Sequence, residues 1–523
     1  MPRWWSIAAC AALAGCTNVG PDFVQPDAPV AEAFQAGESS QVKASAPQLV
    51  DWWQAFDDPR LNALIAEAYA QNLSLETAGL RVLEARAQLG IAIGNQYPQQ
   101  QQLNGSATWI RRSENNANST AGDLNYSQFG LSADIAWELD FWGKFRRGIQ
   151  SADAALLASI ASYDDALVLL IAQVTDTYTV IRATQEQLRL ARENVKLQTR
   201  SFEITNTLFR NGAESELDMQ QARTLLLSTE ATIPGLEATL TQATNALSVL
   251  LGRPPGDLSA ALGSEGDVPT APAELAVGIP ADLLRRRPDV REAELRAAAQ
   301  SALIGVARAD LYPSFVLTGS LGLVAAGGTG TTRTGDSGFD ALFSGDSLQF
   351  SGGPAFSWNL LNYGRIKNSV RVQDARYQQT ILGYQQTVLS AAEEVENAIT
   401  LFLRGREQEM ILNEVVTSAR RSVQLSTLRY KEGFADYQRV LNAQQSLFTS
   451  QQRYVNAKSG TVRALIALYK ALGGGWELRA GNDFIDDSTR ELMRERTDWG
   501  RLLEIGASEI PADERDRLRG PDW

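Results

Sequence analysis

The sequence has no histidine among its 523 residues and only two cysteines, Cys10 and Cys16. Without histidine, Ser-His-Asp and Cys-His catalytic groups and histidine-based zinc sites are excluded. Two cysteines cannot form a Cys₄ zinc site or a disulfide framework. Basic residues are also the minority, with 48 Lys and Arg against 61 Asp and Glu, a net charge of −13. The composition therefore argues against nucleic-acid binding and against an enzyme, and we expect no catalytic residue, metal or non-covalent cofactor.

The N-terminus has the pattern of an export signal. Arg3 precedes an apolar run at residues 4–14, which is too short to span a membrane. The run ends in Leu-Ala-Gly-Cys16, which resembles the lipobox of bacterial lipoproteins. This resemblance implies removal of residues 1–15, a covalent lipid on Cys16, and delivery to the outer membrane because Thr17 follows. A plain signal peptide with an incidental cysteine is the alternative.

The chain is internally duplicated. Trp137 and Trp358 lie 221 positions apart, as do Gly212 and Gly433, and further matches extend across most of the chain. Each half is predicted to contain a helix (60–96 and 281–311), two strands, a very long helix (144–210 and 365–431) and a shorter helix (215–251 and 436–472).

The long helices carry the strongest periodic signal. Between residues 156 and 209, apolar or small residues recur at alternating steps of three and four, which is typical of supercoiled helices. No proline interrupts residues 144–233, so the helix over 144–210 would be roughly 100 Å long. Periodicity alone favours a coiled-coil scaffold.

Four strands are predicted, at 102–112, 128–141, 314–324 and 348–361. Apolar and polar residues alternate along them, as in Leu131, Ala133 and Ile135 against Ser132 and Asp134. Alternation of this kind fits a half-buried soluble sheet or the wall of a transmembrane β-barrel. Four strands cannot close a barrel, and an open edge in lipid leaves backbone groups unpaired. If the strands span a membrane, several copies must share one wall.

Several stretches resemble NodT-type outer membrane efflux lipoproteins, which are TolC-like outer membrane factors. They lie at residues 16–23, 52–61, 279–291, 304–313 and 469–476, and the Leu-Leu-Arg-Arg-Arg-Pro-Asp run at 283–289 is the most specific. The implied fold class is mainly α with a transmembrane β-barrel. Three duplicated copies would form a twelve-stranded outer membrane barrel continuous with a long periplasmic α-helical barrel.

The resemblance also implies function and partners. The protein would be a passive duct in the bacterial outer membrane, lipid-anchored and extending into the periplasm, which completes a tripartite efflux pump for small toxic molecules or drugs. Its partners would be two further copies of itself, outer membrane lipid, a periplasmic adaptor and an inner-membrane transporter of the resistance-nodulation-division type. A type I protein secretion duct and a periplasmic coiled-coil lipoprotein scaffold are the alternatives.

The expected domain organisation follows from these features. It comprises a signal peptide (1–15), an extended N-terminal segment (16–58), a first repeat (59–252), a connecting segment (253–280), a second repeat (281–475) and a charged tail that is equatorial or disordered (476–523).

The turns after the long helices are the candidate gate. Gly212 and Gly433 suit the left-handed residue that ends a helix, and in the family these tips meet the adaptor. The candidate aperture residues are Glu216, Asp218, Gln438, Arg439 and Asn442. We expect Arg439 to pair with Asp218 or Glu216 across neighbouring tips. Helix capping is the competing role for Asp218, through Ser215, and for Asp436.

Acidic residues on the polar side of the strands are the candidate pore lining. Asp134, Glu138 and Asp140, together with the net negative charge, predict a cation-preferring lumen. An ordinary solvated face is the alternative.

Overall fold

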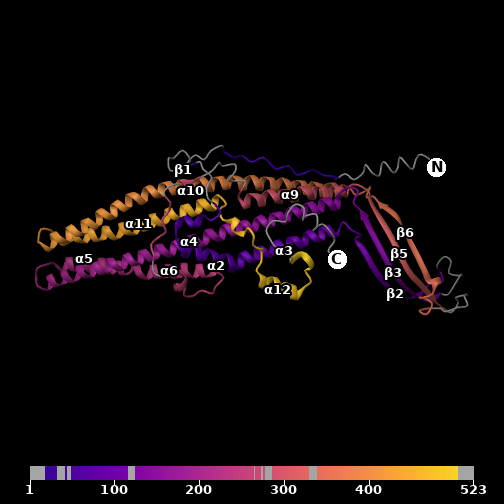
Figure 1. The fold of residues 1–523 in the computed structure, drawn as a ribbon, viewed down its shortest axis with the longest axis horizontal. Coiled ribbons are helices and arrows are strands. Elements are labelled where there is room, and N and C mark those ends of the chain that lie inside the picture. Colours follow the sequence, from indigo (N-terminus) through magenta and orange to yellow (C-terminus); the bar gives the residue numbers. More distant parts are fainter. Residues whose placement is uncertain are drawn as a thin grey trace.

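The computed structural model describes residues 18–31, 42–43, 49–115, 124–263, 266–272, 275–276, 286–328 and 338–503. Cys16, the signal segment and residues 504–523 lie outside this described part. The molecule is strongly elongated, with a β-sheet at one end, two helical hairpin tips at the other, and helices running between them (Figure 1).

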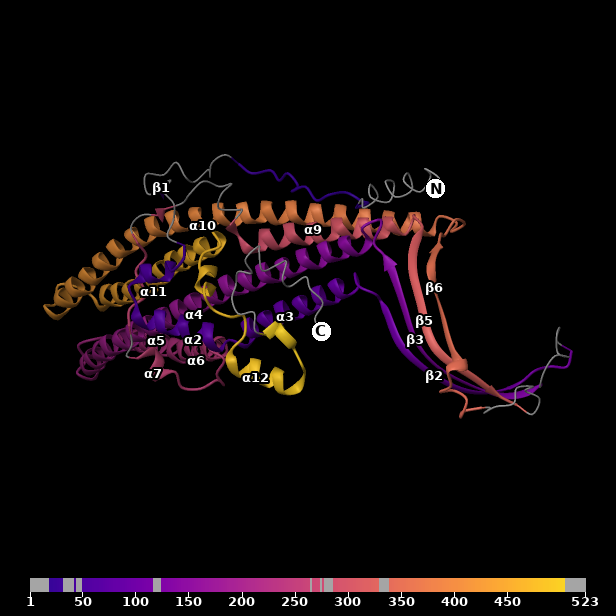
Figure 2. The same cartoon turned by 45° about the vertical axis from the view of Figure 1, so that its right-hand side comes forward.

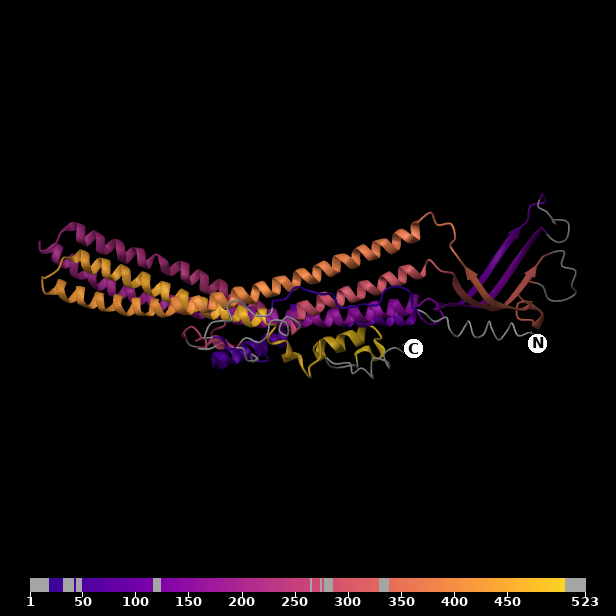
Figure 3. The same ribbon diagram turned by 90° about the horizontal axis from the view of Figure 1, so that it is seen from above.

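Two helices of 67 residues each form the body of the protein: α4 (Lys144–Arg210) and α10 (Arg365–Lys431). Both occupy the residues predicted for them, 144–210 and 365–431, and at 1.5 Å per residue each is roughly 100 Å long. After a short turn, the chain runs back along α10 as helix α11 (Tyr437–Ala471). Seen from above, these helices run along most of the long axis (Figure 3).

The shorter helices differ from the prediction at two breaks. The segment predicted as one helix over 60–96 is α2 (Pro59–Gln71) and α3 (Leu73–Gly94), separated by Asn72. Asn72 Oδ1 accepts a bond from Leu75 N at 2.9 Å, and its Nδ2 donates to Leu250 O, so this residue begins a new helix. The segment predicted over 215–251 is α5 (Glu216–Glu230) and α6 (Thr232–Leu250). Pro234 lies just after this break and has no N–H to donate.

In the second repeat, α9 (Pro288–Ala309) follows Arg287, and proline occupies its first position. Of the predicted helix 281–311, residues 281–285 lie outside the described part. Short elements complete the chain: β1 (Val42–Lys43) pairs in parallel with β4 (Leu275–Ala276), and α7 (Ser259–Leu262) contacts α2.

The sheet has four antiparallel strands in the order β2-β3-β5-β6. They are β2 (Gln100–Arg111), β3 (Asn125–Leu139), β5 (Ser314–Gly327) and β6 (Leu348–Ser357). Each repeat contributes one pair, and β3 joins β5 across the duplication. Figure 2 shows the four strands side by side.

The main hydrophobic core lies around the middle of α4, where it packs against α2, α3 and α11. Trp52, in the short helix Trp52–Phe56, stacks on Tyr469 with ring centroids 5.0 Å apart. Of the described helices, only α4 has an 18-residue stretch apolar enough to cross a membrane, and half of that stretch is buried in the protein. That burial is expected of a core helix.

The first part of the charged tail is ordered and packed. Residues 476–503 form Trp476–Arg479, α12 (Asp487–Arg496) and Gly500–Leu503. Arg479 Nε donates to Asp164 Oδ1 at 2.5 Å, and both side chains are buried. Phe484 lies edge-on to Tyr163 at 5.1 Å. This segment therefore lies against α4 near the middle of the molecule, which is the equatorial alternative.

Candidate functional site

The four strands present one continuous apolar face and one polar face. In an antiparallel sheet, directly paired residues point to the same side. Leu131 pairs with Leu323 of β5, which in turn pairs with Leu348 of β6. Apart from Gln101, opposite Ile135, and Ser127, opposite Trp109, most side chains on this face are apolar, and most are solvent-accessible: Leu103, Ala107, Trp109, Phe129, Leu131, Ala133, Ile135, Trp137, Leu317, Leu321, Phe350 and Phe356. No layer of the described chain covers this face, as expected for a surface that lies in lipid.

Aromatic rings mark both ends of the apolar face. At the end near the helices, Phe141 and Phe315 lie edge-on at 5.0 Å, and Phe315 is 6.4 Å from Phe356. At the far end, Phe129 lies edge-on to Phe339 at 5.5 Å. Phe129 and Trp137 are eight residues apart on β3, so the band between the rings is about 25 Å along the strand. Membrane barrels have an apolar band of about this height between two aromatic girdles.

The sheet has two open edges. Strands β2 and β6 each have a partner on one side only, within the described residues. Each open edge is 10 residues or longer, which leaves a row of unpaired N–H and C=O groups. In lipid such groups cost several kcal/mol each. A sheet of this kind placed in lipid would therefore need further strands along β2 and β6.

The predicted lumen acids separate into two groups. Asp134 and Glu138 lie on the polar face, where Asp134 Oδ2 accepts bonds from Asn104 Nδ2 at 2.7 Å and Ser132 Oγ at 2.8 Å. Asp140 lies beyond the end of β3, so its predicted place on the strand wall needs correction. Its carboxylate accepts from the backbone N–H of Arg146 at 3.0 Å and pairs with the Arg146 guanidinium. Asp140 therefore holds the first turn of α4.

We call residues 18–31 the N-terminal strap. This segment lies along the helices, and its first residues are next to the end of the sheet. Arg147 is 4% exposed and donates to Val19 O at 3.2 Å and to Asp22 Oδ1 at 2.8 Å. A Cβ on Gly20 would lie 2.5 Å from Gly305 Cα, and Gly20 has a φ of +100°, so only glycine fits here. Asn18 follows Cys16 by two residues and lies against Gly143, where the sheet joins α4. The lipid on Cys16 stays a prediction because Cys16 lies outside the described residues.

The two tips at the opposite end share one turn geometry. Gly212 and Gly433 have φ values of +71° and +77°. In each turn the following N–H bonds five residues back, Ala213 to Leu208 O and Phe434 to Arg429 O, both at 2.9 Å. This is the Schellman ending that the glycines predict. A side chain at either position would strain the backbone although the space around it is open.

Within one copy, Asp218 and Arg439 each contact a residue of their own hairpin. Ser215 Oγ accepts from Asp218 N at 3.2 Å and donates to Asp218 Oδ2 at 2.5 Å, so Asp218 takes part in capping α5. Arg439 lies 3.8 Å from Asp436, and within the copy it pairs with neither Asp218 nor Glu216. Asp436 occupies the N-cap position of α11, but its side chain makes no capping bond.

The remaining tip residues leave one face of α11 free. Gln438 Nε2 donates to Asn442 Oδ1 at 3.0 Å. Gln438, Arg439 and Asn442 are all exposed, whereas Tyr437 and Val440 on the other side of the helix are buried. A polar face is thus directed away from the protomer's own packing, and a pairing of Arg439 between copies stays a prediction.

The sequence interpretation missed a contact that joins the two tips. Tyr430 donates from its hydroxyl to Glu214 Oε1 at 3.0 Å, and its ring lies 5.5 Å from that of Tyr437. Burial raises the pKa of both phenols, that of Tyr437 to about 12, so both remain protonated donors at neutral pH. From the sequence alone, a tyrosine on the apolar side of a helix is normally interpreted as a core residue. Glu214 is 216 residues away in the chain, so the sequence does not indicate that it is the partner of Tyr430.

The Arg-Arg-Arg-Pro-Asp motif forms a structural clamp where it is described. Arg287 is 7% exposed and donates to Ala471 O at 2.7 Å, Asp289 Oδ2 at 2.8 Å and Glu394 Oε2 at 3.0 Å. It thereby connects the start of α9 to α10 and to the end of α11. Arg286 pairs with Glu477 in the segment after α11.

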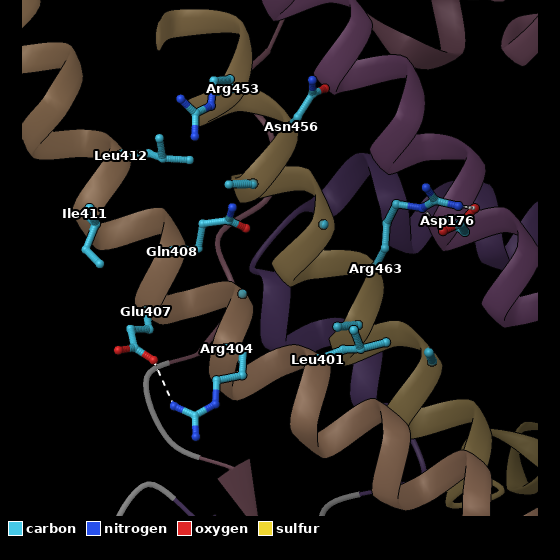
Figure 4. A pocket seen from close by; sticks show the side chains of 15 residues that line it. Asp176, Leu401, Arg404, Glu407, Gln408, Ile411, Leu412, Arg453, Asn456 and Arg463 are labelled. Atoms are coloured by element: carbon cyan, nitrogen blue, oxygen red, sulfur yellow. Dashed lines mark hydrogen bonds and ion pairs between the residues drawn. The ribbon is translucent and has the colours of Figure 1, made fainter.

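A groove of about 1010 Å³ runs between α10 and α11 and is open on one side (Figure 4). Arg463 Nε donates to Asp176 Oδ1 at 2.6 Å, which ties α11 to α4, and Arg404 pairs with Glu407 at 3.0 Å. Along the same helix, α10 exposes apolar residues separated by nearly whole numbers of turns: Leu382, Leu389, Ile411, which also lines the groove, and Leu425. The described part of this copy leaves that side of α10 uncovered.

Comparisons with known proteins give a consistent result. A family model described as outer membrane efflux protein matches residues 64–253 and 279–474. Nodulation protein T of Rhizobium leguminosarum bv. trifolii is 31% identical over 469 residues, 89% of this chain and 95% of the relative. Cation efflux system protein CusC of Escherichia coli (strain K12) is 29% identical over 476 residues, covering 89% and 97%. The solved structure of the outer-membrane channel OprN is 32% identical with a TM-score of 0.81, covering 88% of this chain and all of that chain.

Proposed function

The chain belongs to the outer membrane efflux protein family, and we propose that it forms the passive outer membrane duct of a tripartite pump as a homotrimer. The observation that carries this proposal is the four-stranded sheet, which is predominantly apolar on one face and open at both edges. Such a sheet is costly in water and equally costly in lipid unless its edges are paired.

Three is the smallest number of copies that pairs every open edge and still leaves a passage through the barrel. Joining β2 of one copy to β6 of the next gives a closed wall of twelve strands, four from each copy. Barrels of eight strands are filled by their own side chains, so a wider barrel is needed for transport. The polar face, with Gln102, Asn104 and Ser132, then lines the lumen.

The helices continue this wall through the periplasm. Helices α4 and α10 are long enough, at roughly 100 Å, to carry the duct far from the membrane. The uncovered side of α10 supports a contact with the next copy, so that the helices also close into a ring. Substrate would enter at the tips, where the turns at Gly212 and Gly433 meet a periplasmic adaptor and, through it, an inner-membrane transporter of the resistance-nodulation-division type.

The N-terminal strap supports the proposed lipid anchor. Arg147 fixes the strap to α4 beside the sheet, close to the level at which the membrane would begin. A lipid attached to Cys16 would have to lie at the height of the membrane surface. Each methylene group of its acyl chains that enters the bilayer contributes about 0.8 kcal/mol of binding free energy. The anchor and the sheet would then enter the same membrane.

The tips would act as the gate. Arg439 is exposed together with Gln438 and Asn442, and pairing with Asp218 or Glu216 of the next copy would narrow the aperture. Each exposed pair is worth about 0–1 kcal/mol, so the effect depends on threefold repetition. The Tyr430–Glu214 bond holds the two tips of each copy together in the closed arrangement.

The proposed substrates are small toxic molecules or drugs. The relative CusC is described as a cation efflux protein, and Asp134 and Glu138 on the polar face favour passage of cations, so metal cations are the second candidate class. Deleting the gene should increase sensitivity to drugs or metals, whereas a type I secretion duct would instead lose a secreted protein.

The direct test is the behaviour of the purified protein. We expect a heat-sensitive trimer in detergent and stepwise conductance after insertion into planar lipid bilayers. A water-soluble monomer without conductance would contradict the proposal and favour a periplasmic scaffold. Co-purification with an adaptor and an inner-membrane transporter would identify the remaining partners.

A further inference from the structure

A turn with two exposed phenylalanine rings follows the outer end of β5. We call residues 338–347 the aromatic turn. Phe339 and Phe343 are 57% and 67% exposed, although Leu342 between them is only 4% exposed. The turn is internally bonded, with Leu342 N donating to Phe339 O at 3.1 Å and Ser347 Oγ donating to Ala341 O at 2.6 Å. The rings are therefore displayed by an ordered turn.

The aromatic turn folds onto the apolar side of the sheet. Phe339 lies edge-on to Phe129 at 5.5 Å, and Phe343 lies edge-on to Phe339 at 6.0 Å. Phe129 shares its face with Leu131 and Ile135, because alternate residues of a strand point to the same side. The rings thus extend the apolar face and do not cover the polar face.

The strand itself lacks large side chains at this end. Strand β5 finishes Ala325-Ala326-Gly327, and its residue on the apolar face, Ala325, is only 6% exposed, against 57% for Leu321 further along. Residues Gly345–Ser347 contact β5 here. The aromatic turn therefore supplies large apolar groups where the strand has an alanine and a glycine.

The ring of Phe339 lies over an inner strand of the sheet, although the turn continues directly into β6. Phe129 and Ala325 belong to β3 and β5, the two inner strands, whereas copies would join along β2 and β6. The aromatic turn therefore remains on the outer surface of the assembled wall. Two exposed rings that continue a lipid-facing surface gain free energy only from an apolar surrounding.

We propose that Phe339 and Phe343 form a lipid-binding wedge, which inserts between acyl chains at the boundary of the outer leaflet. This inference rests on the proposed membrane-spanning role of the sheet. Near the helices, strand residues such as Trp137 and Phe315 form the aromatic girdle, and at the outer end the wedge extends it. The wedge would fix the depth of the barrel at the end away from the lipid anchor.

Spin labelling can test the wedge because the chain has few thiols. After removal of residues 1–15, Cys16 would be the single cysteine, and lipidation blocks it. Three single-cysteine variants are needed: Phe343→Cys in the wedge, Asp340→Cys in the same turn, and Leu321→Cys on the apolar face. All three positions are exposed, so the substitutions leave the packing intact. Unsubstituted protein controls for labelling of Cys16.

Each variant is labelled with a nitroxide, and the trimer is reconstituted into phosphatidylcholine vesicles. Collision rates with oxygen, which concentrates in the bilayer, and with a water-soluble nickel chelate report the surroundings of the label. We expect the Phe343 label to resemble the Leu321 label, with high oxygen and low nickel accessibility. The Asp340 label should be the more accessible to nickel.

The outcomes separate the wedge from the function on which it rests. A nickel-accessible Phe343 label together with an oxygen-accessible Leu321 label would overturn the wedge and leave the membrane wall standing. In that case the turn would face water, for example at the mouth of the duct. A nickel-accessible Leu321 label would instead contradict the membrane-spanning sheet itself.

Discussion

Tyr430 and Glu214 join the two helical tips of one copy, with the phenol donating to the carboxylate over 3.0 Å. Tyr430 belongs to the end of α10, and Glu214 precedes α5, so the bond connects the two repeats at the point farthest from the sheet. Nearby, Tyr437 packs with Ala222 and Val440 in a small buried cluster. The tips of one copy therefore form one unit.

Replacing Tyr430 by phenylalanine should loosen the closed state. The ring and its packing remain, while one hydrogen bond to a carboxylate is lost, worth about 1–3 kcal/mol per copy. Tyr430→Phe should raise the open fraction and mean conductance in planar bilayers. Tyr363→Phe is the matched control, because Tyr363 is 96% exposed and lies at the other end of α10. Equal conductance of the two variants would contradict a role for this bond.

Reversing the charge of Arg439 should also open the tips. Arg439→Glu removes the contact with Asp436 and places a third acid near Asp218 and Glu216, so neighbouring tips would repel each other. We expect higher open-channel conductance and a smaller closed fraction, with an effect that weakens as salt concentration increases. Arg404→Glu, whose pair lies in the groove of Figure 4, is the control. Unchanged conductance and closed fraction would remove Arg439 from the gate.

The pH dependence of stability should show the half-buried acid Asp165 on α4. Burial, followed by the nearby carboxylates of Asp289 and Glu292, raises the pKa of Asp165 to about 6, although the nearby Arg287 opposes the shift. A raised pKa means that ionisation costs free energy in the folded state. This cost is present in full above pH 6 and disappears as the pH falls toward the unfolded value near 4.

Trimer stability should therefore increase as the pH is lowered from 7.5 to 5, by no more than about 3 kcal/mol per copy from this residue. Asp165→Asn should stabilise the trimer at pH 7.5 and flatten this part of the curve, measured as the dissociation temperature in detergent. Asp153→Asn, elsewhere on α4, is the control. A variant that keeps the original pH slope would show that Asp165 does not cause it.

Periodic features were predictable from the sequence, and single-residue breaks were not. Helix α4 could be predicted from the apolar repeat over residues 156–209, because so long a repeat provides many turns of signal, and α10 from its place in the duplicated half. The break at Asn72 depends on one side chain that bonds to Leu75 N and Leu250 O. An asparagine within an apolar pattern is a weak capping signal until its partners are known.

The tips show the same limit. Gly212 and Gly433 could be assigned to left-handed turns because few other residues tolerate that backbone. The partner of Tyr430 could not be assigned, since Glu214 comes from the other repeat. Likewise, Asp140 follows the alternation of β3, but the strand ends at Leu139 and its carboxylate serves α4.

Ion selectivity should depend on Asp134. Threefold assembly would place three such carboxylates on the lumen side of the wall, together with Glu138. Asp134→Asn preserves the shape and an acceptor for Asn104 and Ser132, so the fold should be unaffected. We expect the reversal potential in a salt gradient to move toward zero. Asp140→Asn should lower stability and leave the reversal potential unchanged. A wild-type channel that prefers anions would contradict a cation-selective lumen.

Arg287 should be the most sensitive position of the arginine motif. Its guanidinium is buried and binds Asp289, Glu394 and the carbonyl of Ala471 at the end of α11. Arg287→Ala leaves the carboxylates of Asp289 and Glu394 and the carbonyl of Ala471 without this partner. Because the two carboxylates are 28% and 44% exposed, the loss stays below the roughly 3–5 kcal/mol that breaking a fully buried pair costs. Arg286→Ala breaks only the half-exposed pair with Glu477, which is worth about 0–1 kcal/mol. The Arg287 variant should therefore lose most of its trimer yield and the Arg286 variant little, as measured by heat-sensitive trimer bands.

The trimer yield of Arg287→Lys should fall between those of the two alanine variants, because one ammonium group cannot reach all three acceptors in the geometry of the planar guanidinium. Equal yields of the two alanine variants would show that the clamp does not hold α9, α10 and α11 together.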